Sequence, residues 1–161
     1  MSESAVNNID LIIQKMEAYC AYRDRCLFEV EQKLNDFVLI TEVREKIFEH
    51  LYREKFLDET RYVSSFVKGK FNQKHWGKIK ITQELKKRNI PQKLIQTELD
   101  KLNAFDYQNS LLKLLKKKDL VLKENNPYKR KQKLVQFLYS KGYDFQDIQI
   151  AWEDFESQTE Q

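Results

Sequence analysis

Two stretches decide the fold: KIKITQELKKRNIPQKLIQTEL, residues 78–99, and KRKQKLVQFLYSKGYDFQDIQIAW, residues 129–152. When the two stretches are overlaid at a shift of 53 residues, their apolar positions coincide. Leu85 then falls on Leu138, and Ile95 falls on Ile148. Asn89 falls on Gly142, and Asn and Gly are the residue types that most readily take the left-handed conformation ending a helix. The chain therefore repeats a helix, its stop and a following helix.

A shift of 51 residues extends the repeat to the first third of the chain. The pairs that then coincide are Leu34 with Leu85, Leu39 with Ile90, Phe48 with Leu99, and Leu51 with Leu102. Units of this size bury their apolar faces by stacking on one another. We expect an all-α protein of three tandem three-helix repeats, residues 1–56, 57–104 and 105–161, forming an elongated and curved array.

Helical spacing and boundary residues support this fold class. Apolar residues recur at intervals of three and four, beginning with Ile9, Ile12, Ile13, Met16, Tyr19 and Cys20. The predicted N-caps are Thr41, Asp58, Asp106, Asn126 and Asp144, with Pro91 and Pro127 in first turns. Only three Gly and two Pro occur in 161 residues, which disfavours a sheet protein with many tight turns.

Several classes of protein are disfavoured by what the sequence lacks. It has no apolar run of about 18 residues and no secretory leader pattern, so we expect a cytoplasmic protein without membrane contact. Cys20 and Cys26 are interpreted as reduced hydrophobic residues, and His50 and His75 are isolated from other metal ligands. Without a Gly-rich phosphate loop or a nucleophile beside a base, we expect neither a cofactor nor an enzyme.

Charge is distributed unevenly along the chain, although the net charge is only +4. Residues 1–60 carry 8 basic and 13 acidic side chains, a balance of −5. Residues 61–133 carry 20 basic and 6 acidic side chains, a balance of +14, and residues 134–161 carry 1 and 6, again −5. A strongly basic middle favours nucleic acid or an acidic protein surface as partner, and a merely solvated lysine-rich surface is the alternative.

The candidate binding residues are basic, and two pairs of them, Lys80 with Lys87 and Lys129 with Lys133, lie opposite the apolar residues of their helices. Lys80 and Lys87 are two helical turns apart, and Lys80 coincides with Lys133 at the shift of 53. Lys116, Lys117 and Lys118 extend the basic end of another predicted helix, where some of the charge would only complement the helix dipole. The full candidate set is Lys80, Lys87, Arg88, Lys116, Lys117, Lys129 and Lys133, together with Arg23 and Arg25.

Three short motifs resemble the RecX family. Residues 22–30, YRDRCLFEV, look like the opening R-x-R-S-x-x-E-L of that family, with Cys26 in place of serine. Residues 56–63, FLDETRYV, are similar to its Y-L-D-D-x-R-F-A, and residues 133–143 resemble its closing F-L-x-x-R-G-F. Order and spacing agree, and the resemblance covers about residues 9–155.

The resemblance implies a small cytoplasmic regulator of the RecA recombinase. Such a protein binds the RecA filament on single-stranded DNA and damps ATP hydrolysis, strand exchange and SOS signalling. We expect a monomer with weak direct DNA contact through basic residues of the second and third repeats. The alternative is a stand-alone DNA-binding protein whose helix pairs act like a helix-turn-helix.

The motif residues also have structural interpretations. Asp58 is a helix cap, and Arg61 lies three residues on, where it would pair with Asp58 at helical spacing. Arg23, Arg25 and Glu29 share one predicted helix and either join neighbouring helices or reach a partner's carboxylate or phosphate. Gly142 is expected to end its helix.

Overall fold

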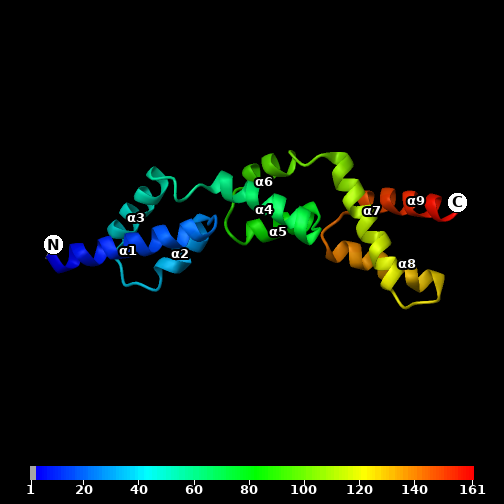
Figure 1. The fold of residues 1–161 in the computed structure, drawn as a ribbon, viewed down its shortest axis with the longest axis horizontal. Helices are drawn as coiled ribbons and strands as arrows, with labels where there is room; N and C mark the ends of the chain where they lie inside the picture. Colours follow the sequence, from blue (N-terminus) through cyan, green and yellow to red (C-terminus); the bar gives the residue numbers. More distant parts are fainter. Residues whose placement is uncertain (1–2) are drawn as a thin grey trace. The chain divides into compact units, whose positions relative to one another are not determined.

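The computed structural model describes the backbone of residues 3–161 and the side chains from residue 8 onward, and all regular elements in this part are α-helices (Figure 1). In chain order they are α1 (Glu3–Tyr22), α2 (Leu27–Leu34), α3 (Thr41–Arg53), α4 (Glu59–Lys74), α5 (Lys78–Lys86), α6 (Gln92–Leu99), α7 (Ala104–Val121), α8 (Pro127–Ser140) and α9 (Phe145–Thr159). None of these described helices is long and apolar enough to cross a membrane. The predicted all-α class and its three-helix grouping are confirmed.

Three of the five predicted N-caps are correct. The side chains of Asp58, Asn126 and Asp144 each accept the backbone N–H three residues on, at 2.9, 3.0 and 2.8 Å. Pro127 is the first residue of α8, as predicted, where its missing N–H leaves no helical hydrogen bond unmade. Local capping chemistry therefore fixes the starts of α4, α8 and α9.

The other two predicted caps are wrong. Thr41 is already inside α3, and Ile40 precedes it without a side-chain cap. Asp106 lies in the first turn of α7, where its N–H donates to Asn103 Oδ1 at 3.1 Å. Pro91 precedes α6 rather than lying in its first turn. Where two capping residues stand within three positions, the sequence alone does not decide which one begins the helix.

Left-handed residues end several helices. Gly142 has φ +95° and Asn89 has φ 57°, so both predicted stops are confirmed. Lys55 after α3 (φ 60°) and His75 after α4 (φ 57°) take the same region, which their residue types did not indicate.

The chain divides into two compact units. The first holds the residues up to 65 together with 88–90, and the second holds residues 66–87 and 91–161. Helix α4 contributes its first half to one unit and its second half to the other. Because these units differ from the three repeats, the repeat boundaries after residues 56 and 104 stay a prediction.

The core of the first unit lies between α1, α2 and α3. Its buried residues are Ile12, Met16, Cys20, Val30, Leu34, Ile47, Leu51 and Leu57. The predicted stripe on α1 thus faces the core. Cys20 and Cys26 are buried free thiols, and burial raises the pKa of Cys20 to about 11, which keeps its thiol neutral at physiological pH.

In the second unit α7 packs against both α8 and α9, and α5 packs against α6. The residues paired by the 53-residue shift are buried at both positions, namely Leu85 and Leu138, Ile95 and Ile148, and Ile90 and Tyr143, of which Ile90 belongs to the first unit. Ile90 and Tyr143 each directly follow a left-handed residue, so the repeated stop turns an apolar side chain into the core. Each buried aliphatic side chain contributes roughly 1.5–3 kcal/mol.

Candidate functional site

A glycine contact joins the start of α5 to the turn between α8 and α9. The N–H of Gly77 donates to the carbonyl of Lys141 at 2.7 Å, and the N–H of Ile79 donates to that of Gly142 at 3.0 Å. A Cβ on Gly142 would lie 2.4 Å from Lys80 Cβ. Gly142 therefore has a structural role, and the backbone of Lys80 is part of the joint.

Lys80 is half-buried rather than turned away from the core. Its Nζ lies 4.7 Å from the centre of the Trp76 ring and donates to the carbonyl of Ser140 at 3.5 Å. Lys70 Nζ lies 4.8 Å from the same ring. Trp76 therefore lies half-buried at the edge of the core, with an ammonium group from α4 and another from α5 beside its ring.

The other candidate lysines of α5 and α8 are mostly engaged by neighbouring acids. Lys87 Nζ lies 2.7 Å from Glu84 Oε1, and Lys133 Nζ lies 3.6 Å from Glu124 Oε1. Lys129 is exposed in the first turn of α8. An exposed ion pair contributes little to stability, about 0–1 kcal/mol, but it lowers the local positive potential. The predicted stripe is therefore partly neutralised.

The remaining candidates do not share one surface. Arg88 is half-buried and belongs to the first compact unit, whereas Lys116 and Lys117 belong to the second. Lys116 Nζ donates to Gln158 Oε1 on α9. Lys117, one residue on, faces a different direction and lines a cavity.

The arginines of the opening motif build the junction between α1 and α2. The prediction that they share one helix with Glu29 is wrong, because Arg23 and Arg25 lie between the two helices and only Glu29 lies in α2. Glu29 Oε1 accepts from Arg23 Nη2 at 2.6 Å and lies 3.8 Å from Arg25 Nη1, while Glu29 Oε2 accepts the Cys26 N–H at 3.1 Å. Arg25 Nε donates to the Tyr19 carbonyl at 3.1 Å, and its guanidinium lies 3.8 Å from the Tyr19 ring centre. Arg25 is 10% exposed, so its contacts are internal, while Arg23 is about half exposed.

Arg61 is a second internal anchor of the first unit. Its Nε donates to Asp24 Oδ1 at 2.8 Å, and its two terminal nitrogens donate to the carbonyls of Lys55 and Phe56 at 3.1 and 3.3 Å. The predicted side-chain pair with Asp58 is therefore wrong, because Asp58 accepts the backbone N–H of Arg61 instead. Arg61 pairs with Asp24 at the α1–α2 junction and not with Asp58, which is nearer in sequence.

A basic cavity lies where the end of α4, one face of α7 and the end of α8 meet. We call it the basic cleft, and its volume is about 530 Å³. The lining residues are Gln73, Lys74, His75, Lys113, Leu114, Lys117, Lys118, Val121, Phe137 and Lys141. None of these described lining residues is acidic, so one sign of charge is concentrated in a concave site.

Among the described residues, no acidic side chain pairs with the lysines of the basic cleft. Lys118 Nζ and Lys141 Nζ lie 4.8 and 5.7 Å from the centre of the Phe137 ring, which holds them by its negative face without neutralising them. Within the described part of the chain, no ion pair involves the other three, Lys74, Lys113 and Lys117. The cleft can therefore attract an external anion.

Of the lysines in this cleft, the sequence-based site included only Lys117. The spacing held a further signal, because Lys113, Lys117 and Val121 recur every four residues on one face of α7. Lys74 and Lys141 end two other helices, and only the tertiary packing brings them to that face.

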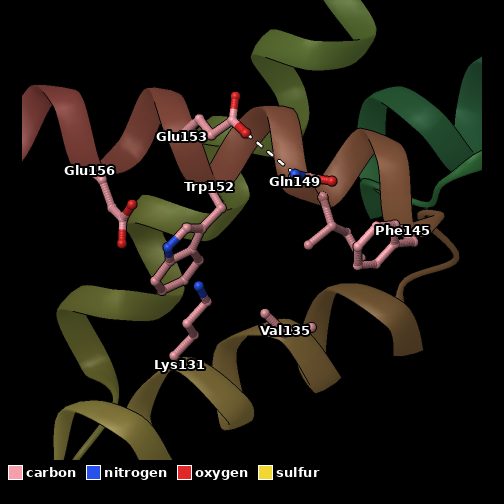
Figure 2. A pocket seen from close by; sticks show the side chains of 8 residues that line it. Lys131, Val135, Phe145, Gln149, Trp152, Glu153 and Glu156 are labelled. Carbon is pink, nitrogen blue, oxygen red and sulfur yellow. Dashed lines mark hydrogen bonds between the residues drawn. The ribbon is translucent and has the colours of Figure 1, made fainter.

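A second cavity, of about 330 Å³, lies between α8 and α9 (Figure 2). Figure 2 shows Lys131 reaching from α8 toward the Trp152 ring, with its Nζ 4.8 Å from the ring centre, and Glu153 and Glu156 on α9. Its lining mixes both signs of charge, unlike the basic cleft. No group of three His, Cys, Asp or Glu side chains that could hold a metal ion occurs among the described residues.

Comparison with known proteins gives matches along most of the chain. Family models for the second and third three-helix domains of RecX match residues 58–99 and 106–152. The regulatory protein RecX of Clostridium botulinum strain Alaska E43 is 33% identical over 146 residues, covering 88% of this chain and 68% of the relative. That of Streptococcus agalactiae serotype V is 28% identical, covering 89% of this chain and 55% of the relative, so the chain spans about half of its length.

The fold is similar to solved structures as well. A crystal structure of RecX from Lactobacillus salivarius has a TM-score of 0.83 at 19% identity, covering 94% of this chain and 98% of that one. A crystal structure of a regulatory protein RecX also gives 0.83, at 21% identity, with 95% and 80% covered. With the family models and the relative in Clostridium botulinum, these matches show that the chain belongs to the RecX family of regulatory proteins.

Proposed function

We propose that this protein regulates the RecA recombinase by binding its filament on single-stranded DNA, and that binding lowers ATP hydrolysis, strand exchange and SOS co-protease activity. Membership of the RecX family is the observation that carries the proposal. DNA repair and recombination are the processes it would affect. The direction of the effect comes from the family resemblance.

The charge distribution supports a filament as partner. Four of the five lysines of the basic cleft come from residues 61–133, the segment with the excess of positive charge, and the fifth is Lys141. A nucleoprotein filament offers both phosphates and protein surface to such a site. We propose the basic cleft as the principal contact. Secondary contacts would come from separate positions, namely Lys87, Arg88, Lys116, Lys129, Lys133 and the exposed Arg23.

We further propose that the protein acts by binding alone, as a cytoplasmic monomer without a cofactor. Its internal ion pairs and thiols have structural explanations, such as the Glu29 junction and the buried Cys20. Regulation would then depend on occupancy of the filament rather than on turnover.

The direct test is RecA-catalysed ATP hydrolysis on single-stranded DNA, followed over time with increasing amounts of the purified chain. We expect the rate to fall toward a plateau as the filament is occupied. A rate that stays unchanged at saturating protein would refute the proposal. The inhibition of ATP hydrolysis by the variant K87E/K133E tests the secondary contacts. K68E/K93E is the charge-matched control, because Lys68 and Lys93 are exposed on α4 and α6.

The alternative function is stand-alone DNA binding, which the acid-free lining of the basic cleft also favours. A mobility-shift assay without RecA separates the two. Tight, salt-sensitive binding would support the stand-alone protein, whereas weak binding with strong inhibition of RecA supports the regulator.

A further inference from the structure

The cavity between α8 and α9 is an apolar groove with acidic edges, and we call it the α9 groove (Figure 2). Its apolar lining consists of Val135, Phe145, Ile148 and Trp152. The Phe145 ring is 65% exposed, and Val135 and Trp152 are half-buried, so these side chains are only partly covered by the protein itself. The volume of about 330 Å³ leaves room for apolar side chains of a second molecule.

The edges of the α9 groove carry carboxylates without a cationic partner. Helix α9 has four acidic and no basic side chains, and among the described residues no ion pair involves any of these carboxylates. Two of them, Glu153 and Glu156, line the groove. Glu153 accepts a hydrogen bond from Gln149 at 3.4 Å, which leaves its charge in place. Such edges repel phosphates and attract cations, so nucleic acid does not suit this groove.

The Trp152 ring already accepts a cation inside the α9 groove. Lys131 Nζ lies 4.8 Å from the ring centre, and Figure 2 shows the ammonium group beside the ring. The negative face of an indole ring attracts ammonium and guanidinium groups alike. Trp152 Nε1 is buried and has no hydrogen-bond partner among the described residues. A buried indole N–H normally has an acceptor, so a carbonyl oxygen of a bound chain would supply what this one lacks.

Helix α3 carries an equivalent cavity. The shifts of 51 and 53 residues together place Phe48 on Trp152 and Glu49 on Glu153. A cavity of about 620 Å³ on α3 is lined by Glu45, Phe48, Glu49, Tyr52 and Arg53. In α6 the equivalent residue, Leu99, is buried at 2% exposure. An aromatic ring beside glutamates therefore recurs in register on the third helix of the first and last three-helix groups, as expected of a feature built into the repeat.

We propose that the α9 groove binds a cationic amphipathic helix of a partner protein. Apolar side chains of that helix would contact Val135, Phe145 and Trp152, and a Lys or Arg side chain would pair with Glu153 or Glu156. Helices enter apolar grooves with anchors three or four residues apart, and Phe145, Ile148 and Trp152 have the same spacing on α9. This goes beyond the proposed function, because the groove excludes phosphates and needs neither RecA nor DNA. The second unit would then have two binding faces of opposite charge.

The test is fluorescence anisotropy of a labelled peptide of about 15 residues, long enough to form a helix, titrated with the full chain. The peptide consists of Ala and Gln with two leucines and two arginines on one helical face. The variant E153Q/E156Q removes the two groove carboxylates. The control D154N/E160Q removes the same charge from exposed positions that do not line the groove. We expect roughly three- to tenfold weaker binding for the groove variant and less than about a twofold change for the control.

Lys131 gives a prediction of the opposite sign. Its ammonium group lies beside the Trp152 ring, where it repels an incoming cation and competes with it. Lys131→Gln should therefore bind the peptide about two- to threefold more tightly. Lys93→Gln removes the same charge from an exposed position outside the groove and should change binding less. Circular dichroism checks that all variants fold.

Two altered peptides separate the apolar and charged contributions. A peptide with glutamates in place of the arginines should not bind, and one with serines in place of the leucines should bind much more weakly. If the serine peptide binds as well as the original, general charge attraction explains binding and the proposal fails. Equal losses in E153Q/E156Q and D154N/E160Q would overturn it for the same reason.

A second copy of this chain is the competing occupant of the α9 groove. Sedimentation velocity over a range of protein concentrations should show no association that E153Q/E156Q abolishes. An association of that kind would assign the groove to contact between copies and overturn the proposal. The proposed function is tested separately, because a chain that binds the peptide but leaves RecA unaffected excludes the filament regulator alone. A chain that inhibits RecA but binds no peptide excludes the α9 groove alone.

Discussion

Gly142 meets two constraints that no other residue type satisfies. Its φ of +95° lies in a region that side chains disfavour, and a Cβ there would lie 2.4 Å from Lys80 Cβ and 2.5 Å from the Lys80 backbone nitrogen. Gly142→Ala would force the α8–α9 turn away from α5. We expect the free energy of unfolding to fall by about 2–4 kcal/mol, measured by urea denaturation followed by circular dichroism.

Gly69 supplies the matched control. It lies inside α4, and a Cβ there would meet nothing within 4 Å. Gly69→Ala should therefore stabilise the protein by about 0.5–1 kcal/mol, because alanine loses less backbone entropy in a helix. Similar destabilisation by both changes would contradict the proposed role of the Gly142 contact.

Left-handed residues show how far residue types predict conformation. Asn89 and Gly142 were predictable because these types favour that region. Lys55 and His75 were not, because distant side chains bind their carbonyls: Arg61 donates to Lys55 at 3.1 Å, and the Tyr143 hydroxyl donates to His75 at 2.9 Å. Tertiary hydrogen bonds support a conformation that the local sequence does not favour.

At the scale of the element, the start of α9 depends on Asp144. Its Oδ1 accepts the N–H of Asp147 at 2.8 Å, so Asp144→Ala should lower the free energy of unfolding by about 1 kcal/mol. Asp144→Asn keeps an oxygen acceptor and should cost less than half as much. Thermal or urea unfolding of the two variants measures the difference, and equal losses would show that the cap bond is unimportant.

The same pair has a pH dependence. Burial, and then the nearby Asp144 carboxylate, raise the pKa of Asp147. A raised pKa favours the folded state below the unfolded pKa, and this contribution is lost as the pH rises through the folded pKa. Asp144→Asn removes the carboxylate that helps to raise the pKa of Asp147. The loss of stability as Asp147 ionises with rising pH should therefore be smaller in this variant.

Helices were predicted more successfully than the site they form. Periodicity and caps identified α8 and α9 because both signals are local. The lysine stripe was predicted from helix faces, but Lys87 pairs within its own turn and Lys133 pairs with Glu124 from the preceding loop. The basic cleft requires the ends of α4 and α8 to meet α7, and sequence spacing carries no information about that meeting.

Over the whole molecule, charge is arranged differently in the two compact units. In the first unit the motif arginines bind carboxylates, as in the Arg61–Asp24 and Arg23–Glu29 pairs. In the second unit the cleft lysines have no such partners among the described residues. The motifs that carry the family resemblance in the first unit therefore stabilise structure, while the surface available to an anion lies in the second.

This division predicts how binding responds to salt. If the five cleft lysines contact three to five phosphates, the logarithm of the association constant for oligothymidine should fall with the logarithm of salt concentration, with a slope of about −2 to −3.5. K113Q/K117Q should make the slope shallower by about 1.4, because the loss of two phosphate contacts means that fewer counterions are released on binding. K68Q/K93Q should keep the wild-type slope. Anisotropy titrations at several salt concentrations measure all three, and a parallel change in both variants would mean that the phosphates respond to total charge rather than to the cleft.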